Sequence, residues 1–108
     1  MAELYEYALP TDAPLYEITA ELDGSTYRFR FDYQAKSDRF YLSIYTAAGD
    51  ALRRGIKVLA GWNVLRLCRS ADRPPGVIYF LDLASTEAEP PALRDLGRRV
   101  RFFYVAEA

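Results

Sequence analysis

The residues best suited to chemistry in this chain are arginines that alternate with aromatic side chains. Two segments have this pattern, Arg28-Phe29-Arg30-Phe31 and Arg99-Val100-Arg101-Phe102-Phe103-Tyr104. Cations interleaved with aromatic rings are typical of surfaces that bind phosphates and stack the bases of single-stranded nucleic acid. In a strand, however, successive side chains point to opposite faces, so the arginines and the rings do not share one surface. The pattern therefore favours core packing, and the acidic pI also argues against nucleic acid.

Catalytic and metal-binding groups are scarce in the sequence. There is no histidine, which excludes histidine metal sites and the common Ser or Cys triads. Asp32 and Asp82 lie within expected strands, but nothing in the sequence places two carboxylates together. The single cysteine, Cys68, excludes an internal disulfide and is expected to be a small packing residue. We therefore predict no enzyme activity, no metal and no cofactor.

Charge is distributed unevenly along the chain. Residues 1–50 contain nine acidic and four basic residues, whereas residues 51–108 contain six acidic and ten basic residues. Such polarity can orient a subunit among its neighbours through complementary patches, although scattered solvated charges would also produce it. The apolar stretches are too short to cross a bilayer as a helix, and the acidic beginning Met1 to Glu6 does not resemble a secretory signal. No membrane partner or export is expected.

Alternating apolar and polar residues predict strands throughout. Asp23-Gly24 is a strong signal for a tight hairpin turn, because such turns need positive φ. Opposite charges on the polar face of that hairpin, Glu17 and Glu21 against Arg28 and Arg30, are placed where they could pair across the strands. The expected strands cover residues 4–9, 15–22, 27–33, 40–46, 51–59, 77–83 and 98–105.

Three segments need separate interpretation. Residues 61–69 are expected to form one or two helical turns, because Trp62, Leu65 and Arg69 have helical spacing. The strand 77–83 is apolar on both faces, which is typical of a central strand or of a strand packed on another subunit. Residues 84–96 form a long polar link, either a surface loop with one helical turn or a segment that reaches a partner.

Together these patterns predict a single domain over residues 1–108 that is all-β. The expected architecture is a small antiparallel β-barrel or sandwich of about six to eight strands, with one short helical segment near residues 61–69.

The order and spacing of these signals resemble the baseplate plug proteins of contractile-tailed phages over nearly the whole chain. The residues on which the resemblance depends are Asp23-Gly24 with Tyr27 and Arg28, Phe40-Tyr41-Leu42, Gly61 with Leu65, Pro74-Pro75-Gly76, Asp82, Asp95-Leu96-Gly97 and the terminal Tyr104-Val105. The resemblance implies a non-enzymatic structural subunit of the virion tail baseplate, assembled in the host cytoplasm. It also implies several copies in a symmetric assembly, packed near the hub, tube or wedge subunits.

Apolar or strongly charged positions supply the candidate contacts with those partners. They are Trp62, Arg66, Ile78, Phe80, Arg98, Arg99 and Arg101. Phe80→Asp is accordingly predicted to leave a folded monomer that no longer enters the baseplate. The alternatives are an independent β-barrel module that binds single-stranded nucleic acid or polysaccharide, or a small enzyme whose pocket carboxylates the sequence does not reveal.

Overall fold

The computed structural model describes residues 4–59, 61, 63–68, 73–82, 93 and 95–106, the Leu67 side chain excepted. Its strands form a three-stranded sheet in the order β1-β7-β6 and a four-stranded sheet in the order β2-β3-β4-β5. All neighbouring strands are antiparallel. The strands are β1 (Leu4–Tyr7), β2 (Leu15–Leu22), β3 (Ser25–Gln34), β4 (Arg39–Thr46), β5 (Ala51–Lys57), β6 (Val77–Asp82) and β7 (Val100–Val105). The predicted all-β class is confirmed.

The four-stranded sheet is a meander whose first turn is the predicted Asp23-Gly24 hairpin. Both turn residues have positive φ, 51° and 85°, as a tight hairpin of this kind requires. The turn fixes the register, and alternate β3 residues are buried while Arg28 and Arg30 are exposed. The last strand, β5, pairs with β4 through irregularities in register, and Gly55 at φ 69° allows that bend.

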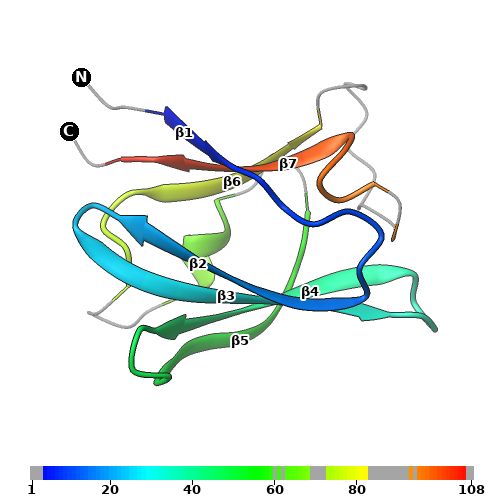
Figure 1. The fold of residues 1–108 in the computed structure, drawn as a ribbon, viewed down its shortest axis with the longest axis horizontal. Helices are drawn as coiled ribbons and strands as arrows, with labels where there is room; N and C mark the ends of the chain where they lie inside the picture. Colours follow the sequence, from blue (N-terminus) through cyan, green and yellow to red (C-terminus); the bar gives the residue numbers. More distant parts are fainter. Residues whose placement is uncertain are drawn as a thin grey trace.

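The three-stranded sheet joins the two ends of the chain. β7 lies in its centre, with β1 on one edge and β6 on the other. Both termini consequently emerge at the same end of this sheet (Figure 1). The predicted strand 4–9 ends at Tyr7, and the strand predicted over 98–105 begins at Val100. The strand predicted over 77–83 is observed over Val77–Asp82, and Leu83 lies outside the described residues.

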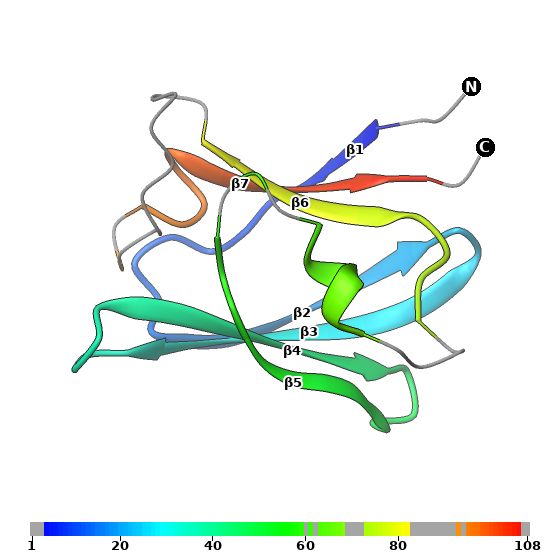
Figure 2. The same ribbon diagram turned by 180° about the vertical axis from the view of Figure 1, so that it is seen from behind.

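The two sheets face each other as two layers (Figures 1 and 2), and aromatic rings fill the space between them. Phe31 of β3 contacts Phe80 of β6 edge to face, with ring centroids 6.0 Å apart. Phe102 of β7 stacks on Phe80 at 5.3 Å and meets Phe29 of β3 edge to face at 5.2 Å. All four rings have no exposed surface. Burial of this much apolar area, at roughly 25 cal/mol per Å², is the main force that holds the layers together.

A short 3-10 helix, η1 (Val64–Leu67), lies where the sequence predicted helical turns. Asn63 fixes it: the Asn63 Oδ1 accepts hydrogen bonds from the N–H of Leu65 at 3.1 Å and of Ile78 at 3.2 Å. The first bond caps the helix and the second ties it to β6. Cys68, directly after η1, is 1% exposed, in agreement with its predicted packing role. No helix in the described part of the chain is long and apolar enough to span a membrane.

Candidate interaction surface

Two of the predicted contact residues, Ile78 and Phe80, are in the core of this chain. Both have 0% of their surface exposed and belong to the cluster between the sheets. Neither can reach a neighbouring subunit while the domain is folded. The expectation that Phe80→Asp leaves a folded monomer must therefore be corrected, because the substitution would bury a carboxylate among apolar rings.

Two further contact candidates, Trp62 and Arg66, belong to the predicted helical segment 61–69. Trp62 lies outside the described residues. Arg66 is exposed near the end of η1, where a cation also suits the negative end of the short helix. Its contact role stays a prediction.

The three arginines around the start of β7 make ion pairs within the chain. Arg98 pairs with Asp12 at 2.7 Å, and Arg101 approaches Glu6 at 3.7 Å. These four side chains are about half exposed, so the pairs contribute little to stability. Arg98 and Arg101 therefore remain accessible to a partner.

Arg99 has a structural role. It donates to Asp82, whose side chain is only 3% exposed, and to Asp95 at 2.8 Å. The hydrogen bonds to Asp95 and Asp82 raise the pKa of the Arg99 guanidinium, so the cation is permanent. Arg99 thus fixes the turn before β7 to the end of β6.

The interleaved arginines and aromatic rings lie on opposite sides of their strands. Phe29, Phe31 and Phe102 are fully buried, whereas Arg28, Arg30 and Arg101 are exposed. These rings are not available to stack on bases, which removes the feature that suggested nucleic-acid binding. Among the residues that the structure describes, no three Asp, Glu or Cys side chains are grouped so as to hold a metal ion.

The outward-facing side of the three-stranded sheet is largely apolar. The register places Leu4, Val105 and Val77 in one row across the sheet, and Glu6, Phe103 and Tyr79 in the next. Phe103 is 8% exposed but lies outside the core cluster, and Leu4 is 59% exposed. We call this surface the outer apolar face; it comprises Leu4, Val77, Tyr79, Leu81, Phe103 and Val105.

The sequence contained a signal for the outer apolar face in the doubly apolar strand 77–83. One set of alternating residues, Ile78 and Phe80, packs inward. The other set, Val77, Tyr79 and Leu81, is half-buried on the opposite face. If one face of this strand contacts a partner, as predicted, that face is therefore the one formed by Val77, Tyr79 and Leu81.

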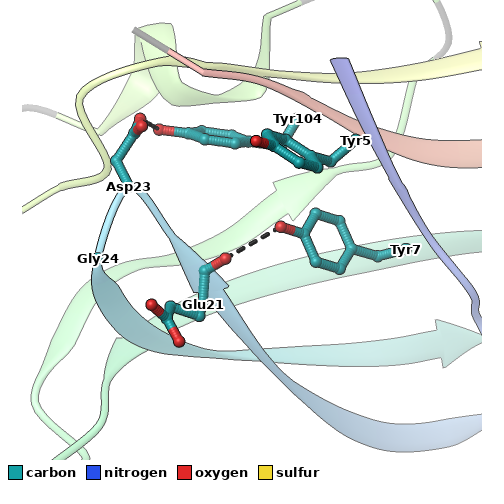
Figure 3. Close-up of a pocket in the computed structure, with 6 residues that line it drawn as sticks. All are labelled: Tyr5, Tyr7, Glu21, Asp23, Gly24 and Tyr104. Atoms are coloured by element: carbon teal, nitrogen blue, oxygen red, sulfur yellow. Dashed lines mark hydrogen bonds between the residues drawn. The ribbon is translucent and has the colours of Figure 1, made fainter. Parts of the chain in front are cut away.

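A cleft of about 380 Å³ opens between β1 and the β2–β3 hairpin (Figure 3). We call it the tyrosine pocket; its lining consists of Tyr5, Tyr7, Glu21, Asp23, Gly24 and Tyr104. Tyr104 is buried; its hydroxyl donates to Asp23 and accepts a hydrogen bond from the Gly76 N–H at 2.8 Å. The Tyr7 hydroxyl donates to the Glu21 carbonyl at 3.0 Å.

Burial raises the pKa of two phenols in the pocket, Tyr7 and Tyr104, and so keeps them protonated. Burial is the main cause that raises the pKa of Tyr7, and the charges of Asp23 and Glu21 add to it. Burial and the hydrogen bond to Asp23 raise the pKa of Tyr104. Sequence reasoning missed this pocket because it depends on pairing between the first and last strands, although Tyr5 and Tyr7 alternate as residues on one strand face do.

Comparison with known proteins gives one family. The family model described as cyanophage baseplate Pam3 plug gp18 matches residues 4–107. No curated protein matches the chain. The match covers every strand described above.

Proposed function

The chain belongs to the cyanophage baseplate Pam3 plug gp18 family and is a phage tail baseplate plug component; from this we propose that it packs beside the central hub or tube and contributes to baseplate assembly. It acts as one domain over residues 1–108, without catalysis, in several copies arranged symmetrically. It folds in the host cytoplasm before it enters the virion. The single core shared by both sheets supports the one-domain proposal.

The observation that best supports a packing role is the outer apolar face. Leu4 is largely exposed on this face, Val77, Tyr79, Leu81 and Val105 are half-buried, and Phe103 is 8% exposed. Exposed apolar side chains clustered in this way are typical of surfaces that bind a partner. Phe103 occupies its centre, Leu4 and Val105 lie along one side, and the ion pair of Glu6 with Arg101 borders it. An apolar centre with a charged rim is the usual anatomy of a stable interface. The partner we propose for this face is a hub or tube subunit.

The test replaces an exposed leucine on this face and a matched leucine elsewhere. Leu4 is 59% exposed on β1, and Leu15 is 54% exposed on β2 of the other sheet. Burial of a leucine at an interface stabilises it by roughly 1.5–3 kcal/mol, which is roughly a tenfold or larger change in affinity. Leu4→Glu is expected to fold normally and to lower the amount of the chain in purified virions by that factor. Leu15→Glu is expected to be incorporated like the wild type.

The measurement is quantitative mass spectrometry of virions produced by complementation, with thermal unfolding of each purified variant as a control. Equal incorporation of both variants would remove the outer apolar face from the baseplate contact. A chain absent from wild-type virions would overturn the baseplate role itself.

A further inference from the structure

Two opposite sides of the molecule have charges of opposite sign. β1 and β2 are on the side seen in Figure 1, whereas β5 and η1 are on the side seen in Figure 2, across the shortest dimension of 21 Å. The first, which we call the acidic side, has Glu17 and Glu21 on β2 and Asp23 in the hairpin turn. The second, the basic side, has exposed cations on and beside β5 and η1: Arg53, Arg54, Lys57, Arg66 and Arg73.

Two acidic residues of the acidic side, Glu17 and Glu21, and two cations of the basic side, Arg53 and Lys57, form no ion pair within the described part of the chain. Glu17 is directly opposite Arg30 across the strands, yet no ion pair within 4.0 Å involves Glu17 or Glu21 among the described residues. The same holds for Arg53 and Lys57 on β5, within that described part. The expected pairing across the β2–β3 hairpin is therefore not made, and these charges remain available to another molecule.

The tyrosine pocket gives the acidic side a place for a cation. The Asp23 carboxylate, which accepts a hydrogen bond from the Tyr104 hydroxyl, lies at one end of the pocket, and the rings of Tyr5 and Tyr7 line it beside the Glu21 carbonyl (Figure 3). Carboxylates attract a guanidinium group, and aromatic faces add a cation–π contribution. A pocket of about 380 Å³ has room for an arginine side chain.

Arginines that could enter this pocket lie on the basic side of the same chain, on β5. We propose that copies of this chain associate front to back, so that the acidic side of one copy binds the basic side of the next and an arginine of β5 enters the tyrosine pocket.

Such a contact uses different surfaces on the two copies. Contacts of this type close into rings when the rotation between copies permits and otherwise continue as stacks. The outer apolar face is not used, so it stays free for a hub or tube subunit. The inference thus goes beyond the proposed function and can fail without it.

The test is a pair of charge reversals on purified protein. One variant is Glu17→Lys with Glu21→Lys, and the other is Arg53→Glu with Lys57→Glu. The four side chains are exposed, so both variants should fold, which far-UV circular dichroism checks. The matched control is Lys36→Glu with Arg98→Glu, two reversals of exposed cations that lie outside β2, β3, β5 and η1.

Sedimentation velocity provides the measurement, at roughly 50 mM and roughly 500 mM salt. The wild type and the control should associate at low salt and separate at high salt. Each variant alone should associate roughly tenfold more weakly or worse, because like charges then face each other. An equimolar mixture of the two variants should associate again, since each supplies the charge that the other lost.

Three results would overturn the proposal. They are a wild type that stays monomeric at low salt, variants that associate as the wild type does, and a mixture that stays monomeric although each variant is folded. If both variants are monomeric, are not rescued by mixing and are also missing from virions, the charged sides bind a different baseplate protein.

Discussion

Phe80→Ala is the substitution that most directly tests how the two sheets are held together. Phe80 is the β6 residue at the centre of the aromatic cluster, stacked on Phe102 at 5.3 Å and edge to face with Phe31 at 6.0 Å. Removal of its ring would leave a cavity lined by these two rings, because neither sheet can close the gap without losing its own strand pairing.

The size of the effect follows from burial and from ring contacts. Phe→Ala substitutions at fully buried sites lower the free energy of unfolding by about 3–5 kcal/mol. Phe80 has 0% exposure and two ring contacts, each worth about 0.5–1.5 kcal/mol beyond area burial, so we expect the upper half of that range. Domains of this size are stabilised by about 5–15 kcal/mol in total. The midpoint temperature should fall by roughly 15 °C or more.

Tyr79→Ala is the matched control, because it removes a larger ring from the adjacent residue on the opposite face of β6. Tyr79 is outside the core cluster, so its loss should cost less than about 2 kcal/mol. Urea unfolding followed by circular dichroism gives both free energies. Equal losses, or a loss under about 1 kcal/mol for Phe80→Ala, would refute the assignment of Phe80 to the core.

Ion pairing and tyrosine burial lead to two further predictions. Arg99→Ala should lower the free energy of unfolding by about 2–4 kcal/mol, because it leaves the 3% exposed Asp82 carboxylate without this cation. Arg98→Ala should lower the free energy of unfolding by less than about 1 kcal/mol, because its partner Asp12 is 48% exposed. Similar urea midpoints for Arg99→Ala and Arg98→Ala would contradict this reasoning. Burial raises the pKa of Tyr16 and Tyr104, so above pH about 10 the folded state keeps protons that the unfolded state releases. Stability should be level below that pH and fall above it, and a flat profile up to about pH 11 would disagree.

Local patterns in the sequence predicted most of the strands because most of them have one solvent-exposed polar face. β2 and β3 alternate strictly, and the Asp23-Gly24 turn fixes how they pair. The helical turns near Val64 were predicted from spacing, although the Asn63 hydrogen bonds that fix them to β6 were not. Short-range signals therefore suffice where the partner strand is the next one in the chain.

Contacts between distant segments were beyond such reasoning. β1 pairs with β7 across almost the whole chain, and no local feature of Leu4 to Tyr7 indicates that partner. The tyrosine pocket depends on this pairing, because it brings Tyr104 of the last strand beside Asp23. The sequence likewise could not decide which face of the strand around Phe80 packs inward, since both faces are apolar.

The position of β7 in the three-stranded sheet explains how one small domain can offer separate surfaces to different neighbours. Its inward residues, Phe102 and Tyr104, fill the core and the pocket floor, while Phe103 points to the outer apolar face. A partner on the outer apolar face and a second copy at the tyrosine pocket would therefore touch opposite faces of β1 and β7. Because β7 is hydrogen-bonded on both edges, neither contact needs to disturb the strand that positions both surfaces. A plug held by several neighbours at once needs this independence, and substitutions on one surface should leave binding at the other unchanged.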